Sequence, residues 1–306
     1  MKLLLFNDIQ FQHEIKEFCK ILGPDVFLIP FNYSKDHEFI SNLQKDYDVI
    51  YSHDPNNLFN LYPKIPYFYD ILPHTAPNEL MFNKFKEYYT QLQGAKAVFT
   101  GDKKLNKYAE WLDLNTYWIT NSTIISKLLP KKFLTPDLHI LFNSKDKNNL
   151  SYNIVKQFWK TKKSNWHLHI YGDYLPTDFS DNVCFYDYPD SSLLNTCHII
   201  LDLSVFHNNT LDLFPSSFAL KAMNNGCVLV STNLHGNNTN IIFDEVHYFR
   251  LDPLFTETLS DLIRNLDKRR EKLQRVSLAG YNVVKKYFNV SKIVSQKLRI
   301  LNARDY

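Results

Sequence analysis

Glycine is scarce in this chain, which has 7 glycines among 306 residues. A glycine loses more conformational entropy on folding than other residues do, so we expect each one to mark a turn, a strand end or a close approach of the backbone. The first glycine is Gly23. The chain therefore has no glycine-rich loop after its first apolar run, residues 3–7.

Cysteine and long apolar runs are rare as well. The 4 cysteines form no C-x-x-C pair, and three of them lie in apolar runs, which favours buried thiols in a reducing compartment. The apolar start of the chain is too short for a signal peptide, and no later run approaches the length of a membrane span. We therefore expect a cytoplasmic protein. The sequence shows no spacing typical of metal ligands, so we predict no metal site.

The excess of positive charge is small. A net charge of +3 gives no reason to expect a nucleic acid as partner. Basic residues nevertheless gather between Arg264 and Lys286. Two interpretations stay open for this stretch: a helix face in contact with water, or a face that docks on an anionic membrane and holds the protein at the inner membrane surface.

The first half of the chain alternates short apolar runs with segments of helical spacing. The predicted strands are residues 3–7, 25–31, 48–52, 66–70, 97–101 and 116–120, and the predicted helices are 11–22, 37–45, 78–93 and 103–112. Apolar strands that alternate with helices indicate a parallel sheet covered on both faces. We assign residues 1–133 to this first domain.

The pattern restarts after residues 129–137, which contain two prolines and two lysines and have the composition of a linker. The further strands predicted are 138–144, 166–172, 182–188, 198–204, 227–232 and 247–252, with helices at 149–162, 190–196 and 216–225 and a helical tail from 256 to 304. The fold prediction is α/β, with two tandem Rossmann-like domains. The second domain covers 138–285, and we expect the C-terminal helix of 286–306 to pack back on the first.

The second half carries a series of segments in a fixed order: HILFNSKDKNN, HLHIYGD, NVCFYDYPDSSLL, HIILDLSVF, FPSSFALKAMNNGCVLVSTNLHGNNTNII and HYFRLDP. This series resembles the GT-B glycosyltransferases, and among them the retaining enzymes of family 4. The resemblance covers residues 138–252 best. It implies a nucleotide-diphosphate sugar as substrate, no cofactor and no metal, and a glycan, a lipid-linked sugar or a protein as acceptor.

The sequence departs from the family at its acidic signature. The family has two glutamates separated by seven residues, and the second stands directly before an Ala-Met pair. Here Lys221 stands at the second position and Leu213 at the first. Asp212 lies beside the first position, so we predict that Asp212 replaces that glutamate as a catalytic residue.

Cations and helix N-termini hold the diphosphate in this family, because negative charge grows there as the glycosidic bond breaks. The arginine that follows the first strand of the donor domain is missing here, and Lys145 and Lys147 are the candidates to replace it. Ser216 and Ser217 begin the helix that would face the phosphates. Their alternative role is simple N-capping.

Glycines approach the sugar and the nucleotide in the family. Gly236 and Asn237 match its glycine loop, and Gly172 ends a predicted strand at the nucleotide side. For Gly172 and Gly236, a plain turn is the alternative interpretation. All of these residues count as predicted donor-binding residues.

The first domain offers candidates on the acceptor side. His74 follows the strand 66–70 near the place of a family histidine, and we predict that it contacts a sugar hydroxyl or the β-phosphate. His53 and Asp54 follow the strand 48–52, and Asn7 and Asp8 follow the first strand. Surface turns are the alternative for all of them.

Three functions follow from these residues. The first is a glycosyltransferase that moves a sugar to a glycan, lipid-linked or protein acceptor with retention. The second is a catalytically degenerate GT-B protein that acts as a glycan-binding or chaperone-like subunit, as the missing acidic residues favour. The third is a sugar-binding or epimerase-type protein, which would need no acceptor.

Overall fold

The computed structural model describes the chain in stretches: residues 1–6, 12–29, 37–52, 66–71, 92–101, 103–120, 122–125, 133, 135–144, 149–172, 179, 181–187, 191–203, 215–232, 241–252 and 257–303. These residues form two compact units. The first unit takes its described residues from 1–124 and 288–303, and the second from 125–203 and 215–287.

The first unit contains a parallel sheet of six strands in the order β2-β1-β3-β4-β5-β6. The strands are β1 (Leu3–Phe6), β2 (Val26–Ile29), β3 (Val49–Ser52), β4 (Tyr67–Ile71), β5 (Ala97–Thr100) and β6 (Thr116–Trp118). Strands β1, β3 and β5 are buried along their whole length. Burial on both faces explains why these runs are continuously apolar rather than alternating.

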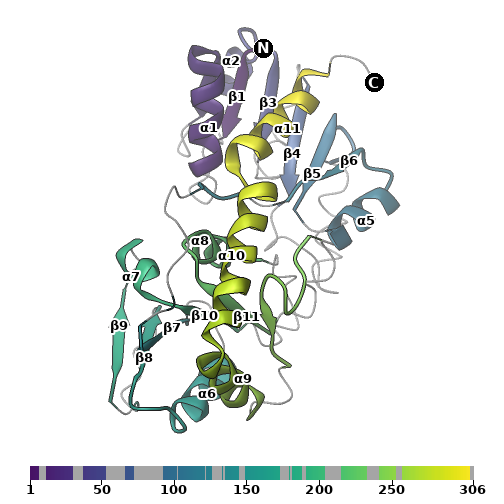
Figure 1. Ribbon diagram of the computed structural model, residues 1–306. Coiled ribbons are helices and arrows are strands. Elements are labelled where there is room, and N and C mark those ends of the chain that lie inside the picture. Colours follow the sequence, from purple (N-terminus) through teal and green to yellow (C-terminus); the bar gives the residue numbers. More distant parts are fainter. Residues whose placement is uncertain are drawn as a thin grey trace. The chain divides into compact units, whose positions relative to one another are not determined.

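Helices cover both faces of this sheet. The helices are α1 (Gln12–Leu22), α2 (His37–Leu43), α5 (Lys103–Trp111) and α11 (Val290–Asn302), with a 3₁₀ turn at Gly23–Asp25. Helices α1 and α11 lie side by side on one face, where Phe18 and Val294 pack against Leu5 (Figure 1). On the other face, Phe39 and Ala109 belong to the same core as Leu4. The last helix of the chain is therefore a structural part of the first unit.

A buried ion-pair network fastens α11 to this unit. The Nζ of Lys297 lies 2.6 Å from the Oε2 of Glu14 on α1 and 2.5 Å from the Oδ2 of Asp70 on β4. The hydroxyl of Tyr51 on β3 donates to the same Asp70 oxygen at 2.8 Å. Lys297 is 3% exposed. Because a buried charge must be paired, this geometry fixes how α11 docks on the sheet.

The second unit is built in the same way. Its six parallel strands have the order β12-β11-β10-β7-β8-β9. They are β7 (Leu138–Asn143), β8 (Trp166–Tyr171), β9 (Val183–Tyr186), β10 (Ile199–Asp202), β11 (Val228–Ser231) and β12 (Phe249–Arg250). The chain crosses from β9 at one edge to β10 in the interior, so strand order reverses direction beside β7 and β10. Ligands of open parallel sheets bind at such a reversal.

The helices of this unit are α6 (Asn149–Trp159), α7 (Ser191–Thr196), α8 (Ser217–Asn224), α9 (Glu257–Lys268) and α10 (Arg270–Tyr287). Helices α6 and α9 pack on one face around Phe142, and α8 contacts β10 and β11 (Figure 1). Helix α10 packs closely on α8 at Gly280, where a methyl group would lie 3.1 Å from the Cε of Met223 on α8 and 3.0 Å from the backbone oxygen of His247. Gly226 ends α8 with a φ of +76°, as a helix C-cap requires.

The structure confirms the predicted α/β fold with two Rossmann-like units and helices at the C-terminus. The predicted helix at 78–93 lies outside the described residues except for its end. Two details of the sequence prediction were wrong. Cys184 is exposed, because β9 is an edge strand, and Phe133 of the expected linker is buried in the core of the second unit. Among the described helices, none is long and apolar enough to cross a membrane.

Candidate functional site

The carboxyl ends of the strands in the second unit carry buried polar side chains. Asn143 ends β7 and Ser144 follows it, Asp202 ends β10, and Thr232 follows β11. Hydrogen bonds join the neighbouring strand ends. Ser144 donates both its N–H, at 2.7 Å, and its hydroxyl, at 2.9 Å, to the backbone oxygen of Tyr171. These hydrogen bonds therefore fix the geometry of this polar edge of the sheet.

Helix α8 begins at this edge, and Ser216 is its N-cap. The Oγ of Ser216 accepts the N–H of Ala219 at 3.0 Å, and its hydroxyl donates to the Oδ2 of Asp202 at 2.7 Å. The Ser216 side chain thus has the capping role that the sequence left open. Asp202, which the sequence analysis missed, sets the orientation of that cap from the end of β10.

The first turn of α8 starts directly after the cap. The side chain of Ser217 is exposed, and the N–H groups of a first turn have no partner within the helix. Phe218 stacks on Tyr171 at the end of β8, with 5.6 Å between ring centroids. This contact brings the start of α8 next to the end of β8.

The electrostatics of this helix start are mixed. A helix N-terminus carries roughly half a positive charge and favours an anion. The buried carboxylate of Asp202, which bonds to the cap, places a negative charge directly behind it. An anion with two charges at this position consequently needs further cations. Lys145 and Lys147, in the segment after β7, are the sequence candidates for that role.

Gly172 ends β8 in a conformation that requires glycine. Its φ is +142°, and its N–H donates to the backbone oxygen of Tyr186 at 3.4 Å. Side chains rarely tolerate this φ, so the residue is glycine for a backbone reason. The bend lies at the same edge as the start of α8.

Most of the predicted site residues lie outside the described part of the chain. These are Asn7, Asp8, His53, Asp54, His74, Lys145, Lys147, Asp212, Gly236 and Asn237. Of the predicted set, the structure describes Gly172, Ser216 and Ser217, and all three lie at one edge of one sheet. Lys221, at the family's glutamate position, is in the last turn of α8.

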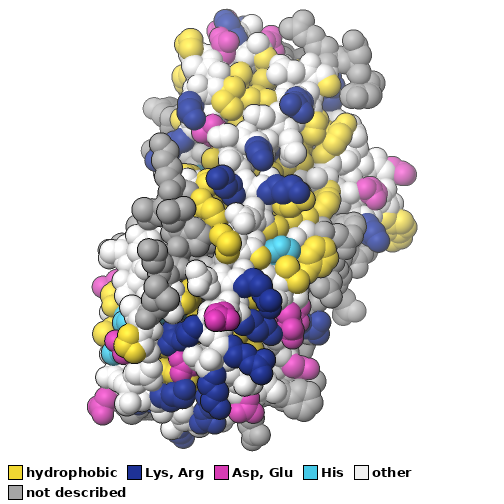
Figure 2. All heavy atoms as spheres, viewed as in Figure 1, with side chains coloured by type: hydrophobic (Ala, Val, Ile, Leu, Met, Phe, Trp, Pro, Cys, Tyr) yellow, Lys and Arg dark blue, Asp and Glu magenta, His cyan; other side chains and the backbone are white. Residues whose placement is uncertain are grey.

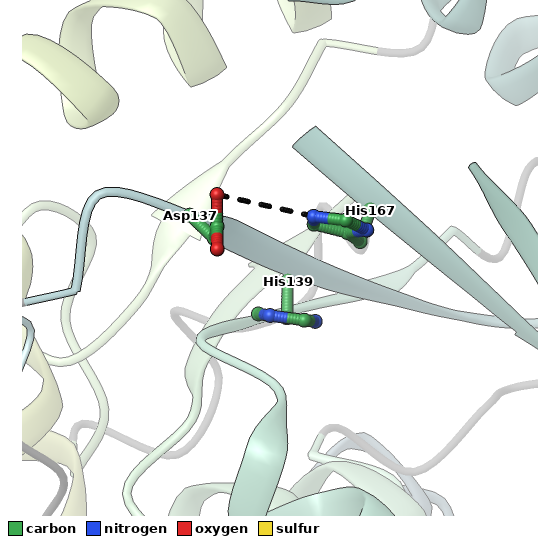
Figure 3. A group of neighbouring side chains, drawn as sticks. All are labelled: Asp137, His139 and His167. Carbon is green, nitrogen blue, oxygen red and sulfur yellow. Dashed lines mark ion pairs between the residues drawn. The ribbon is translucent and has the colours of Figure 1, made fainter. Parts of the chain in front are cut away.

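Sequence reasoning also missed a group at the opposite, amino edge of the same sheet. Asp137, His139 and His167 each offer a ligand atom, and these atoms lie within 4.8 Å of one another (Figure 3). The patterns Asp-x-His at 137–139 and His-x-His at 167–169 were the available signal. Alternate residues of a strand share a face, so both patterns put their side chains on one side of the sheet.

Comparison with known proteins bears on the fold. No model of a protein family matches this sequence, and no curated protein sequence matches it. Among solved structures, Anabaena HepE in complex with UDP-glucose superposes with a TM-score of 0.77 at 13% identity, over 99% of this chain and 100% of that one. A glycosyltransferase from Rickettsia africae has a TM-score of 0.73 at 14% identity, over 98% of each chain. Sucrose-phosphate synthase from Thermosynechococcus elongatus has a TM-score of 0.69 at 11% identity, over 98% of each chain.

The chain has the GT-B fold. This agrees with the two parallel six-stranded sheets and with the helix α11, which returns to the first unit. At these identities the likeness extends to the fold alone. The sequence resemblance assigns the donor to the second unit. The polar edge at Asn143, Gly172 and Ser217 belongs to that unit.

Proposed function

We propose that this protein is a glycosyltransferase that takes a sugar from a nucleotide-diphosphate donor. The observation that carries the proposal is the GT-B fold over the whole length of the chain, shared with a protein whose structure contains UDP-glucose. The buried polar edge of the second unit adds to it. The nucleotide sugar is the substrate, and the proposed reaction uses no further cofactor.

In this proposal the diphosphate lies at the start of α8. The N–H groups of its first turn, apart from that of Ala219 which donates to the cap, face the phosphates, and Ser217 adds an exposed hydroxyl. Lys145 and Lys147 supply the cations that offset both the leaving-group charge and the carboxylate of Asp202. Gly172 lets the nucleotide approach the end of β8, and Gly236 and Asn237 contact the sugar.

The catalytic and acceptor-side roles are the finer part of the proposal. Asp212 takes the place of the first family glutamate, and His74 assists from the first unit. The acceptor is a glycan, a lipid-linked sugar or a protein, and the sugar is transferred with retention. Asn7, Asp8, His53 and Asp54 are the residues proposed for the acceptor side, and no metal takes part in the transfer.

A calorimetric titration with UDP-, GDP-, ADP- and TDP-sugars tests the proposal. We expect one nucleotide class to bind and to be hydrolysed slowly in the absence of acceptor, which chromatography of the released nucleotide detects. Binding without hydrolysis or transfer would favour the degenerate, non-enzymatic subunit. Failure of every donor to bind would refute the glycosyltransferase proposal.

We also propose that the basic face of α9 and α10 contacts an anionic membrane. Figure 2 shows Lys and Arg side chains gathered over these helices, and Lys268, Arg269 and Arg275 are exposed. Neighbouring acidic groups offset part of the charge, since Arg270 pairs with Asp267 at 2.6 Å. Anionic lipid attracts such a face by roughly 1 kcal/mol per basic residue.

Sedimentation with phosphatidylglycerol vesicles tests the membrane contact. The wild type should bind at low salt and be released at high salt, and a variant with serine at positions 268, 269 and 275 should bind less. Serine at Lys16 and Lys20 of α1 is the matched control. Equal binding by both variants would show that this face is only solvated.

A further inference from the structure

Four histidines share one face of the sheet in the second unit. His139 of β7 is the register partner of His167 of β8, and His198 precedes β10 at the same level. Their rings are in contact, with centroids 4.7 Å apart for His139 and His167 and 5.6 Å apart for His139 and His198. His169 follows His167 by two residues on β8. The group is at the amino edge of the sheet, away from the candidate donor site.

Hydrogen bonds link His139 through His169 to Tyr186. The Nδ1 of His139 lies 3.0 Å from the Nε2 of His169, and the Nδ1 of His169 lies 3.1 Å from the Tyr186 hydroxyl. When the Nδ1 of His169 donates to the Tyr186 hydroxyl, its Nε2 accepts the N–H of His139. In that tautomer the second ring nitrogen of His139, Nε2, carries the lone pair.

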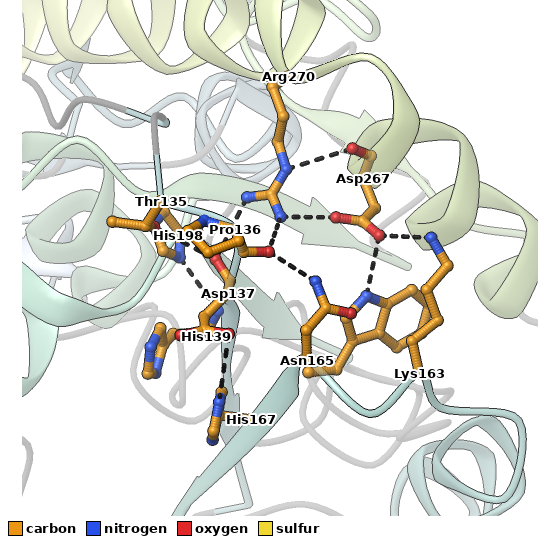
Figure 4. A network of polar contacts seen from close by, with 11 residues as sticks. Thr135, Pro136, Asp137, His139, Lys163, Asn165, His167, His198, Asp267 and Arg270 are labelled. Carbon is orange, nitrogen blue, oxygen red and sulfur yellow. Dashed lines mark hydrogen bonds and ion pairs between the residues drawn. The ribbon is translucent and has the colours of Figure 1, made fainter.

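Asp137 is held beside these rings by its backbone. Arg270 donates to the carbonyl oxygens of Pro136, at 3.2 Å, and Asp137, at 3.4 Å, and Asn165 donates to that of Pro136 at 2.5 Å (Figure 4). Asp267 in turn fixes Arg270 through an ion pair of 2.6 Å. The Oδ1 of Asp137 consequently lies 3.9 Å from the Nε2 of His167. Three hydrogen bonds to its backbone thus anchor the segment that presents this carboxylate.

We propose that Asp137, His139 and His167 bind a divalent transition-metal ion of the Zn²⁺ class. Two imidazoles and one carboxylate are ligands that Zn²⁺ takes in proteins, with a fourth position left for water. A ligating histidine usually donates its second ring N–H to a neighbouring acceptor, which fixes its tautomer. The chain from His139 through His169 to Tyr186 supplies that arrangement.

The distances require a small closure. Ligand atoms around a tetrahedral Zn²⁺ with bonds of about 2.05 Å are about 3.3 Å apart, and the three ligand atoms here lie within 4.8 Å of one another. The rings of His139 and His167 are also stacked, with 13° between their planes, so one ring has to turn for both to point at one ion. The side chains of His167 and Asp137 are 36% and 49% exposed and have room for this movement.

The location gives the ion a structural role. It would join the segment before β7 to β8, near the start of the second unit. Along β7, Asn143 is the fourth residue after His139, which is about 13 Å at the rise of a strand. The ion would thus lie far from the carboxyl edge of the sheet, and its binding does not depend on the proposed sugar transfer.

Titration of the untagged protein with Co²⁺ and Zn²⁺ tests this site. Co²⁺ bound to nitrogen and oxygen ligands gives visible absorption bands, and calorimetry measures the affinity for Zn²⁺. All proteins should carry Cys184→Ser, because Cys184 is exposed on β9 as the register partner of His169 and its thiol would bind the same ions. We expect one ion per chain and a higher Tm in its presence.

The variants separate the site from general damage. His167→Ala and Asp137→Asn, both at partly exposed positions, should each weaken Zn²⁺ binding about 100-fold or more. Tyr186→Phe removes only the hydroxyl that accepts the N–H of His169 and should weaken binding about 10–100-fold. His247→Gln, in a turn of the same unit, is the matched control and should bind as the parent does. Absence of binding in the parent, or equal binding by His167→Ala and Asp137→Asn, would overturn the proposal.

Discussion

Replacing Lys297 by methionine removes the charge that pairs Glu14 and Asp70 while keeping the length of the side chain. The three residues are 3%, 2% and 7% exposed, and the Nζ–O distances are 2.6 and 2.5 Å. The variant leaves two carboxylates in the core without their cation, and the hydroxyl donors from Tyr51 to Asp70 and from Ser122 to Glu14 stay in place. Loss of one member of such a buried pair typically costs about 3–5 kcal/mol. This is a large fraction of the roughly 5–15 kcal/mol that stabilises a whole domain.

Hydrogen exchange measures this loss where it occurs. Peptides from α11 and α1 should exchange faster in Lys297→Met by the factor that corresponds to about 3–5 kcal/mol, whereas peptides from α9 in the second unit should not change. Lys292→Met, at an exposed position of the same helix, should stay within about 0.5 kcal/mol of the wild type.

A triple variant tests the physical cause. Glu14→Gln and Asp70→Asn, added to Lys297→Met, remove the unpaired charges and should restore a substantial part of the stability. The reasoning would be refuted if the α11 peptides of Lys297→Met exchanged as slowly as those of Lys292→Met. It would also be refuted if the triple variant were less stable than the single one.

The pH dependence of this network has a defined sign. Burial alone would lower the pKa of Lys297, but Asp70, Glu14 and Tyr51 raise it, and the pKa lies well above its ordinary value of 10.5. A raised lysine pKa contributes stability that is fully present below the unfolded value and is lost as pH rises through the folded value. Between pH 7 and 9, protection of α11 should therefore not fall on account of Lys297.

The remaining predictions concern the candidate donor site. Ser216→Ala removes the cap of α8 and should lower the free energy of unfolding by about 1 kcal/mol, measured by urea denaturation, with Ser217→Ala as the control that changes it little. Gly172→Ala forces a side chain into a φ of +142° and should destabilise the second unit by about 1–3 kcal/mol; an unchanged Tm would contradict this. Alanine at both Lys145 and Lys147 should weaken donor binding by about 2–3 kcal/mol in calorimetry, while Lys160→Ala should not. His74→Ala should lower turnover more than donor affinity, and no effect on either would remove His74 from the mechanism.

Local patterns in the sequence predicted the fold well. Continuous apolar runs such as those of β3 and β10 identify strands buried on both faces, and the Asn-Asn-Gly after α8 marks its end. The ends of the elements differ by up to three residues; the helix predicted at 149–162, for example, ends at Trp159. Phe133 misled the prediction of a linker, since prolines and lysines surround a residue that belongs to a core.

Long-range contacts account for what the sequence did not show. Lys297 reaches Glu14 across 283 residues and Asp70 across 227, so nothing near any of them marks a buried ion pair. In the sequence Asp202 is an ordinary residue at the end of a strand, and its partner Ser216 comes 14 residues later. His139 and His167 become neighbours only through the register of β7 and β8. In each case the partner is brought in by the topology of the sheet.

Hydrogen exchange of the wild type with and without nucleotide tests the central claim most directly, which is that a nucleotide-diphosphate sugar binds at the carboxyl edge of the second sheet. With saturating UDP-glucose, or with whichever donor the calorimetric panel selects, peptides that contain Ser217 and Phe218 should exchange more slowly, together with those that follow β7 and β8. Peptides at the amino edge, around His139 and His167, should not change. Binding without protection at the start of α8, or protection confined to the amino edge, would contradict the assignment of the donor site.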